Sequence, residues 1–468
     1  MLPGMRRSGV LALLVACVVP LSGCVRIIEG LPTSLQPPVS AVPSGEIEIV
    51  GASGDPIDQL ARNALADLQD FWTAQFPDAF GDRFQPLQGG FFSVDPGNID
   101  RRVYPNGVGC GSDPRDVENN AFYCQAQGEP NSDSISYDRA FLAELADQFG
   151  DFIPDLVMAH EFGHAVQARV GSPRTSIATE TQADCFAGAW TAWVADGKAQ
   201  HTTVRAPELD QVLRGYLQLR DPVGTDRGEQ QAHGSYFDRV SAFQEGFGDG
   251  VTACRDNFPD NRVFTQQGFS RGDLETGGNA PGNAPYDGLP DIIRSTLDPF
   301  WEDVVGSRGK NFDAPRVESL DGRAPRCAGD RELDYCTDEN VAAVDGAQLG
   351  QTIYQQIGDF AVISAVSVPY ALAARKQLGL STDDTDAVRS AVCLTGTYGR
   401  ALFDQKIDQP TQPPVSISPG DIDEGVIFLL DYGKDPKVFP QSDLTGFELV
   451  DVFRTGFVRG VKACGLGT

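Results

Sequence analysis

Three apolar segments with helical character stand out along the chain. Residues 156–170 contain few helix breakers, and Pro154 just before them suits the first turn of a helix. Residues 185–190 form an apolar run inside a second expected helix over 178–194. Residues 360–374 are too short to span a membrane and include a proline and two serines, so we expect a buried helix there.

A fourth apolar run lies at the N-terminus. Arg6 and Arg7 precede residues 9–20, which are too short for a transmembrane helix, and the sequence Leu-Ser-Gly-Cys then ends at Cys24. This order resembles a bacterial lipoprotein signal, in which residues 1–23 are removed and Cys24 receives the lipid. An ordinary cleaved signal peptide is the alternative. We therefore expect an exported protein, anchored by lipid to the outer face of the bacterial cell membrane or elsewhere in the cell envelope.

Composition divides the remaining chain into segments. Residues 24–55 include a Pro- and Ser-rich stretch, which predicts an extended tether from the membrane. We expect a compact domain over residues 56–256. Gly, Asn and Pro are frequent in residues 257–290, which predicts a linker, and apolar periodicity resumes in a second domain over 291–468.

The two expected domains resemble each other in sequence. Residues 243–254 (FQEGFGDGVTAC) match residues 453–464 (FRTGFVRGVKAC) at an offset of 210. Residues 150–171 match residues 358–379 without gaps at an offset of 208, and this offset also aligns further cysteine and glycine positions. Several matches in the same order predict a duplicated domain.

The cysteines indicate disulfides. The chain has ten, and eight remain without Cys17 in the signal and Cys24 at the anchor. An even number in an exported chain favours disulfides, and the absence of any CxxC spacing argues against a cysteine zinc site. Eight cysteines allow roughly a hundred pairings, but a duplication favours one pattern used twice. The expected pairs are Cys110–Cys124, Cys185–Cys254, Cys327–Cys336 and Cys393–Cys464.

Composition and charge exclude some functions. The chain is 41% hydrophobic and 22% charged, which is typical of a soluble globular protein. Its formal net charge of -28 argues against a nucleic-acid partner, because such a chain does not neutralise phosphates. Attachment to a membrane must then come from the lipid and not from charge.

The segment HEFGH supplies the clearest candidate chemistry. His160 and His164 lie one turn apart on the expected helix, so both imidazoles project from one face about 6 Å apart along the axis. This spacing lets two neutral nitrogens bind one Zn²⁺, and Glu161 can act as general base for a zinc-activated water. Two solvated surface histidines are the alternative, but the flanking residues are apolar. We expect one Zn²⁺ per chain.

A catalytic zinc needs a third protein ligand and an open position for water. Glu180 and Asp184 lie one turn apart on the expected helix over 178–194. We expect Glu180 to bind the metal and Asp184 to accept a hydrogen bond from the far nitrogen of a ligating histidine. The alternative is that Asp184 binds the metal and Glu180 supports a ligand without binding the metal itself. A solvated acidic pair at a helix start is a third interpretation.

These segments together resemble a known family. HEFGHAVQ from His160 and ETQADCFAGAW from Glu180, with AFYC (121–124) before them and HGSYFDRVSAFQEGF (233–247) after them, resemble the bacterial neutral zinc metallopeptidases. The resemblance covers roughly residues 71–254. The order HExxH…ExxxD is also similar to the thermolysin-like class.

The resemblance implies a fold and a set of roles. The fold is α+β, a zincin-like metallopeptidase domain with the active-site helix beside a small sheet, followed here by a degenerate repeat of the same domain. The resemblance implies these roles: His160, His164 and Glu180 as zinc ligands, Glu161 as general base, and Asp184 as the group that orients a ligand.

Other site residues are less well indicated. His233 lies in a polar turn before an apparent helix and is our candidate catalytic donor to the developing oxyanion, with Tyr236 and Arg239 as alternatives. A loop histidine without a role explains it equally well. We expect His201 at the surface. Residues 134–137 alternate like a strand, either an ordinary structural strand or an edge that pairs with a substrate peptide.

The second domain lacks the proposed chemistry. At the offset of 208, apolar residues replace the ligands, the base and the orienting acid. The replacements are His160 to Val368, Glu161 to Pro369, His164 to Leu372, Glu180 to Val388 and Asp184 to Val392. We expect a non-catalytic copy, and three roles stay open for it: positioning substrates, shielding the active cleft, or offering a docking surface to a protein partner.

The sequence therefore predicts a zinc-dependent peptidase that hydrolyses a peptide or protein substrate at the cell envelope. One alternative is a scaffold lipoprotein with a structural zinc, which would have four protein ligands. Another is a zinc hydrolase that acts on a non-peptide amide of the envelope.

Overall fold

The computed structural model describes residues 40–411, 413–440 and 442–466. The proposed signal peptide and lipidation site at Cys24 lie outside these residues. The described chain has a mixed α+β fold that divides into two compact units. Unit 1 is the described chain up to Leu219 together with Ala242–Arg262, and unit 2 is Arg220–Ser241 together with the chain from Val263 onward. No described helix is long and apolar enough to cross a membrane.

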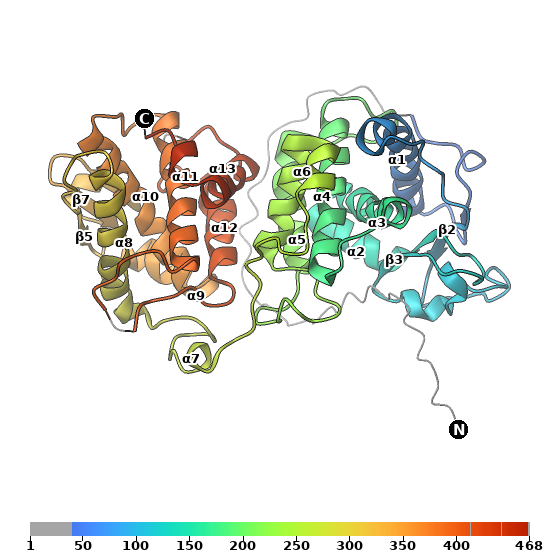
Figure 1. The fold of residues 1–468 in the computed structure, drawn as a ribbon, viewed down its shortest axis with the longest axis horizontal. Helices are drawn as coiled ribbons and strands as arrows, with labels where there is room; N and C mark the ends of the chain where they lie inside the picture. The colour runs from blue at the N-terminus through green and yellow to red at the C-terminus, as the bar shows by residue number, and fades with distance from the viewer. Residues whose placement is uncertain (1–39, 412, 441, 467–468) are drawn as a thin grey trace. The chain divides into compact units, whose positions relative to one another are not determined.

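Unit 1 is organised around one central helix, α3, which contacts α1, α2, α4, α5 and two strands (Figure 1). Asp55 starts α1 by accepting a hydrogen bond from the N–H of Ile57, and Asp138 starts α2 in the same way. The helices are α1 (Pro56–Phe80), α2 (Arg139–Phe149), α3 (Phe152–Val170), α4 (Ser176–Ala195), α5 (Ala206–Leu219) and α6 (Tyr236–Asp256), with short 3₁₀ turns at Gly109–Gly111 and Pro114–Val117. Helix α6 begins in unit 2 and continues in unit 1.

A four-stranded sheet lies against α3 in the order β1-β2-β4-β3. Its strands are β1 (Ile49–Val50), β2 (Gly90–Val94), β3 (Ala121–Cys124) and β4 (Ser134–Asp138). The pairs β1–β2 and β2–β4 are parallel, and β3–β4 is antiparallel. Strand β4 is therefore internal, which confirms an ordinary structural strand at 134–137, and β3 is one of the two edge strands.

Unit 2 is organised around α10, which contacts α8, α9, α11, α12 and two strands. Its helices are α7 (Arg271–Leu274), α8 (Leu289–Gly306), α9 (Gln351–Gln356), α10 (Asp359–Leu378), α11 (Thr385–Phe403), α12 (Asp421–Tyr432) and α13 (Gly446–Arg459), with a π turn at Gly346–Gly350 and 3₁₀ turns at Tyr286–Gly288, Arg326–Ala328 and Val461–Ala463. A three-stranded sheet has the order β5-β7-β6 and the strands β5 (Arg316–Glu318), β6 (Leu333–Cys336) and β7 (Val341–Val344). The burial of α10 confirms the helix expected over 360–374.

The unit boundaries differ from the expected domains of 56–256 and 291–468. Residues 220–241, expected in the first domain, belong to unit 2 because Asp423 pairs with Arg220 and accepts the N–H of Phe237 at the start of α6. The expected linker over 257–290 contains α7 and joins unit 2 from Val263.

The end of the expected tether differs as well. Strand β1 pairs in parallel with β2, so the last residues of 24–55 belong to the sheet of unit 1 and not to a tether. Apolar residues at β1 fit this place, because Ile49 is buried.

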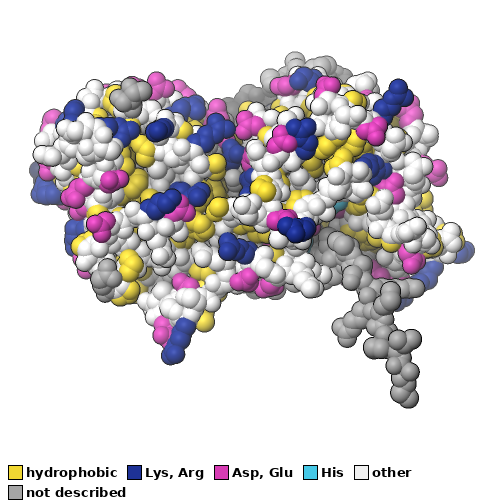
Figure 2. Space-filling view, viewed as in Figure 1, with side chains coloured by type: hydrophobic (Ala, Val, Ile, Leu, Met, Phe, Trp, Pro, Cys, Tyr) yellow, Lys and Arg dark blue, Asp and Glu magenta, His cyan; other side chains and the backbone are white. Residues whose placement is uncertain are grey.

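Four disulfides join the pairs that the sequence analysis proposed, which confirms that pairing. Acidic and basic side chains alternate over the visible face in Figure 2. The net charge of -28 is therefore not gathered into one acidic patch on that face.

Candidate metal centre

The centre is formed where α3 meets α4. Gly163, between the two histidines of α3, faces Ala183, between the two acids of α4, and a Cβ at Gly163 would lie 3.0 Å from the Cα of Ala183. Because the two helices approach each other closely at these residues, the histidine pair of α3 faces the acidic pair of α4. Both helices are mostly buried, as their apolar sequences predict.

Three side-chain atoms converge at this crossing. Nε2 of His160 lies 3.2 Å from Nε2 of His164, and Oε2 of Glu180 lies 3.3 Å from the first nitrogen and 3.5 Å from the second. Zinc bonds of about 2.0–2.2 Å in a tetrahedral site separate two ligand atoms by about 3.3–3.6 Å. The three atoms therefore fit three corners of a zinc tetrahedron.

Each histidine has a partner at its other ring nitrogen. Nδ1 of His160 lies 2.8 Å from Oδ1 of the fully buried Asp184, and Nδ1 of His164 lies 2.9 Å from Oε1 of Gln167. Both contacts favour the tautomer with the proton on Nδ1, which leaves Nε2 free to bind a metal. Asp184 thus lies beside Nδ1 of His160, and Glu180 lies beside Nε2.

Gln167 was not identified from the sequence. Its Nε2 donates to the carbonyl oxygen of Thr179 at 2.7 Å and to Oε1 of Gln182 at 3.0 Å, which turns its Oε1 towards His164. The spacing of three residues from His164 on one helix was the available signal.

Electrostatics favour a cation at this crossing. Burial lowers the pKa of His160, but the charge and hydrogen bond of Asp184 outweigh this effect and, with Glu180, raise it to about 10. Burial also lowers the pKa of His164, whereas Glu180 raises it, with a net increase. Without a metal the carboxylates therefore favour the protonated form of the imidazoles, and zinc binding would compete with protons.

Glu161 faces the edge strand. It is 4% exposed, and its Oε2 accepts the backbone N–H of Tyr123 in β3 at 2.7 Å. Burial raises the pKa of Glu161, and the two histidines act in the opposite direction. The sequence analysis did not anticipate the contact with Tyr123, because it joins residues far apart in the chain.

The ligands are buried but reachable by solvent. The side chains of His160 and His164 retain 13% and 14% exposure, and that of Glu180 retains 8%. A metal bound here would have these three candidate ligands among the described residues, and the partial exposure of both histidines would leave it a side open to solvent. This arrangement is typical of a catalytic site and not of a closed structural one.

His233 and its alternatives, Tyr236 and Arg239, lie in unit 2, whereas the ligand candidates lie in unit 1. Nδ1 of His233 lies 3.2 Å from Oδ1 of Asp221, whose Oδ2 accepts the His233 backbone N–H at 2.7 Å. The assignment of His233 as the oxyanion donor stays a prediction.

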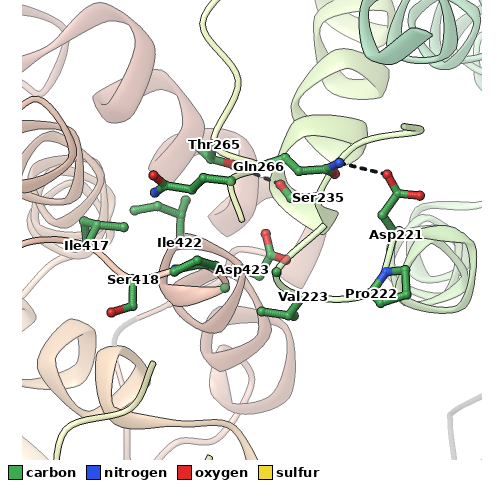
Figure 3. A pocket seen from close by; sticks show the side chains of 14 residues that line it. Asp221, Pro222, Val223, Ser235, Thr265, Gln266, Ile417, Ser418, Ile422 and Asp423 are labelled. Atoms are coloured by element: carbon green, nitrogen blue, oxygen red, sulfur yellow. Dashed lines mark hydrogen bonds between the residues drawn. The ribbon is translucent and has the colours of Figure 1, made fainter. Parts of the chain in front are cut away.

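Asp221 also borders a small pocket within unit 2 (Figure 3). Nε2 of Gln266 donates to its Oδ2 at 2.9 Å. The cavity measures about 20 Å³, which is room for about one water molecule, so this pocket is not a substrate site.

His201 lies apart from the ligand cluster within unit 1. Its Nδ1 is 2.5 Å from the carbonyl oxygen of Ser40, and its backbone N–H donates to Asp67. These contacts are structural, although the residue is partly buried and not fully at the surface as expected.

Comparison with known proteins indicates relatives but no activity. No protein-family model and no solved structure matches the chain. An uncharacterized protein of Mycobacterium tuberculosis is 30% identical over 184 residues, which cover 34% of this chain and 61% of that protein. The uncharacterized protein YpfJ of Escherichia coli is 26% identical over 294 residues, which cover 55% of this chain and 90% of that protein. The chain thus spans about three fifths of the length of its mycobacterial relatives.

Proposed function

We propose that this protein is a zinc-dependent peptidase with His160, His164 and Glu180 as metal ligands and Glu161 as general base. The observation that carries the proposal is the triangle of ligand atoms with sides of 3.2, 3.3 and 3.5 Å beside a buried glutamate. The family resemblance of these segments supports the same reaction class.

Zinc, when bound, supplies a Lewis acid that activates a water and the carbonyl of the scissile bond. The chain supplies the base. Tyr123 holds Oε2 of Glu161, which leaves Oε1 to take the proton of the attacking water and then deliver it to the leaving amine. The raised pKa of Glu161 makes this carboxylate a better proton acceptor at neutral pH than an exposed glutamate.

The edge position of β3 favours a peptide substrate. Extended peptides bind to sheet edges through backbone hydrogen bonds, and among the described strands β3 pairs on one side only, with β4. Tyr123 of this strand contacts the proposed base, so a peptide added along β3 would lie beside Glu161. A small non-peptide amide would not need such an edge.

The number of candidate ligands also favours a catalytic zinc over the structural zinc of a scaffold protein. A structural zinc has four protein ligands, whereas the group at the α3–α4 crossing offers three among the described residues. The partial exposure of both histidines leaves a side for water and substrate.

We further propose that unit 1 is zincin-like and that unit 2 is its degenerate copy. With β1, α2, α7, α9 and the short helical turns left out, both units have a helix, three strands and then four helices. These are α1, β2, β3, β4, α3, α4, α5 and α6 in one and α8, β5, β6, β7, α10, α11, α12 and α13 in the other. Both sheets contain the same arrangement of one parallel and one antiparallel pair, β2-β4-β3 and β5-β7-β6.

Two close helix crossings support the duplication. A Cβ at Gly188 in α4 would lie 1.9 Å from the carbonyl oxygen of Phe243 in α6. A Cβ at Gly396 in α11 would lie 2.0 Å from the carbonyl oxygen of Phe453 in α13. A disulfide accompanies each crossing, and the two disulfides span 69 and 71 residues.

In unit 2 the positions of the proposed site residues are apolar and mostly buried. Val368, Val388 and Val392 are 5%, 7% and 0% exposed. This copy is proposed to lack metal at these positions and to serve a protein partner.

Export and lipid attachment through Cys24 also stay proposals. The four disulfides support export, since disulfides persist in oxidising compartments outside the cytosol.

The test compares the chain from Gly30 onward as wild type, Glu161→Gln and Glu144→Gln, each loaded with zinc. Glu144 is an exposed acid on α2 and serves as the matched control. Each protein is incubated with a diverse peptide library that is then analysed by mass spectrometry. We expect cleavage by wild type and Glu144→Gln and a loss of about 10²–10⁴-fold in Glu161→Gln, with one zinc retained in all three.

Two results would contradict the proposal. Cleavage by Glu161→Gln at the wild-type rate would remove Glu161 from the reaction. A wild type that binds one zinc and cleaves no peptide would favour a scaffold or a non-peptide amide substrate.

A further inference from the structure

A second group of candidate metal ligands lies in unit 2, at the N-terminal turns of α10 and α12. Asp359 is the first residue of α10, and Asp421 and Glu424 lie in the first turn of α12. One carboxylate oxygen from each lies within 4.8 Å of the other two. The three side chains are buried, with 6%, 7% and 9% exposure.

Backbone N–H groups hold each carboxylate in place. Oδ2 of Asp359 accepts from Ala284 at 2.7 Å, and Oδ2 of Asp421 accepts from Ser418 at 2.8 Å. Oε2 of Glu424 accepts from Phe360 at 2.8 Å at the start of α10. Each contact holds one oxygen of a carboxylate and does not involve its second oxygen.

One of these remaining oxygens is buried without a partner. Oδ1 of Asp359 has no hydrogen bond to any described residue, although the side chain is more than nine-tenths buried. A buried carboxylate oxygen without a partner is costly, because it has lost its water. The oxygen therefore indicates a ligand that the protein atoms do not provide.

No described cation neutralises the cluster. None of the three carboxylates forms an ion pair with a described Lys, Arg or His; the nearby Arg220 pairs with Asp423 instead. Burial raises the pKa of all three groups, and the charged neighbours that raise the pKa of Asp421 and Glu424 further are carboxylates.

The surroundings leave room for an ion and its waters. A cavity of about 250 Å³ within unit 2 is lined by Asp359 and Asp421 and also by Asp273 and Thr276. Gly358 faces the carboxylate of Glu424, and a Cβ at this position would lie 1.9 Å from Oε1. The glycine thus makes room for the carboxylate against the first turn of α10.

We propose that Asp359, Asp421 and Glu424 bind one Ca²⁺ ion, a second metal site built from residues other than those of the zinc centre. All three ligands are hard oxygens, which suit Ca²⁺ and not zinc. Two oxygens bound to one Ca²⁺ ion lie at most about 4.6–5.2 Å apart, so three carboxylate oxygens within 4.8 Å of one another can bind the same ion. Water in the cavity completes the six to eight ligands that Ca²⁺ takes.

Calcium is favoured over magnesium by the number of carboxylates, because Mg²⁺ is usually held by only one or two carboxylates and keeps several waters. Mg²⁺ demands a near-ideal octahedron with bonds of about 2.1 Å, whereas Ca²⁺ accepts flexible arrangements of carboxylates and waters. The bound ion would link α10, α12 and, through Ala284, the segment before α8. It would therefore stabilise unit 2.

The cysteine-containing group at Cys327, Cys336 and Glu339 carries no such proposal. Its two sulfurs form a disulfide and cannot bind a metal as thiolates.

The experiment uses the full chain, freed of metals on a chelating resin and reloaded with one equivalent of zinc. Isothermal titration calorimetry with CaCl₂ alone should give one site per chain with a Kd between roughly 1 µM and 1 mM. Asp359→Asn and Glu424→Gln should each weaken binding at least tenfold. Asp431→Asn, an exposed position about 15 Å further along α12, should bind as wild type does.

A second measurement guards against variants that fail to fold. The thermal midpoint of the wild type should rise by several degrees in 5 mM CaCl₂ and by less in 5 mM MgCl₂. Wild type without Ca²⁺ binding or a thermal shift would overturn the proposal and show that the carboxylates hold protons instead. Tighter binding of Mg²⁺ would overturn the choice of ion, and unchanged binding in both folded variants would overturn the location.

Discussion

Asp184→Asn alters the support of one zinc ligand and leaves the three proposed ligands in place. Oδ1 of Asp184 lies 2.8 Å from Nδ1 of His160, and the Asp184 side chain is fully buried. The substitution keeps the size of the side chain but removes its negative charge. Nε2 of His160 then becomes a weaker donor to the metal, and the ring loses its preference for one tautomer.

The expected loss in zinc affinity is about 10–100-fold, which is the usual effect of removing such a supporting group. This corresponds to about 1.4–2.7 kcal/mol in the free energy of zinc binding. The upper part of this range applies if the amide turns its NH₂ group towards His160, because the ring then has to give up its Nδ1 proton. The lower part applies if the amide oxygen continues to accept that proton.

Competition with a chromophoric chelator at constant pH measures the zinc Kd. Asp155→Asn is the matched control, because Asp155 is also a buried acid on the same helix as His160, and its charged neighbours, Asp67 and Asp151, are not proposed ligands. We expect its zinc Kd to equal that of the wild type. A zinc Kd of Asp184→Asn within twofold of the wild-type value would refute the supporting role. A loss of zinc as complete as in His160→Ala would instead indicate that Asp184 is itself a ligand.

Two further predictions concern stability. Gly188→Ala should lower the free energy of unfolding by about 1–3 kcal/mol in urea titrations, because its Cβ would lie 1.9 Å from the Phe243 carbonyl oxygen. Gly248→Ala is the control and should not lower it, because no atom lies within 4 Å of a Cβ at that position. Burial raises the pKa of Asp238 to about 6, above the unfolded value of about 3.9, so the folded chain takes up this proton first as pH falls. The free energy of unfolding of wild type relative to Asp238→Asn should therefore rise by up to roughly 3 kcal/mol from pH 7 to pH 4, and a difference independent of pH would contradict this.

The sequence by itself determined the features that depend on spacing along one element. Two histidines four residues apart on an apolar helix must share a face, and the structure has that helix over Phe152–Val170. The same reasoning gave the acidic pair of α4. The disulfide pattern followed from the match between the two halves, because a repeated sequence favours repeated pairs.

Contacts between elements could not be read from the sequence. The choice of Glu180 as the residue on the metal side depends on how α3 crosses α4 at Gly163, and no spacing within either helix specifies that crossing. The N–H of Tyr123 reaches Glu161 only because β3 is the sheet edge beside α3. Gln167 supports His164 only because α4 holds its amide in one orientation.

Tertiary structure alone decided the unit boundaries and the carboxylate cluster. Residues 220–241 join unit 2 because the carboxylate of Asp423, about two hundred residues later, accepts the first N–H groups of α6. Asp359 and Glu424 are brought together by the meeting of two helix N-termini, where free backbone N–H groups attract carboxylates. The sequence shows which residues lie on the same helix or strand, whereas the packing of helices and strands decides which residues lie in the same site.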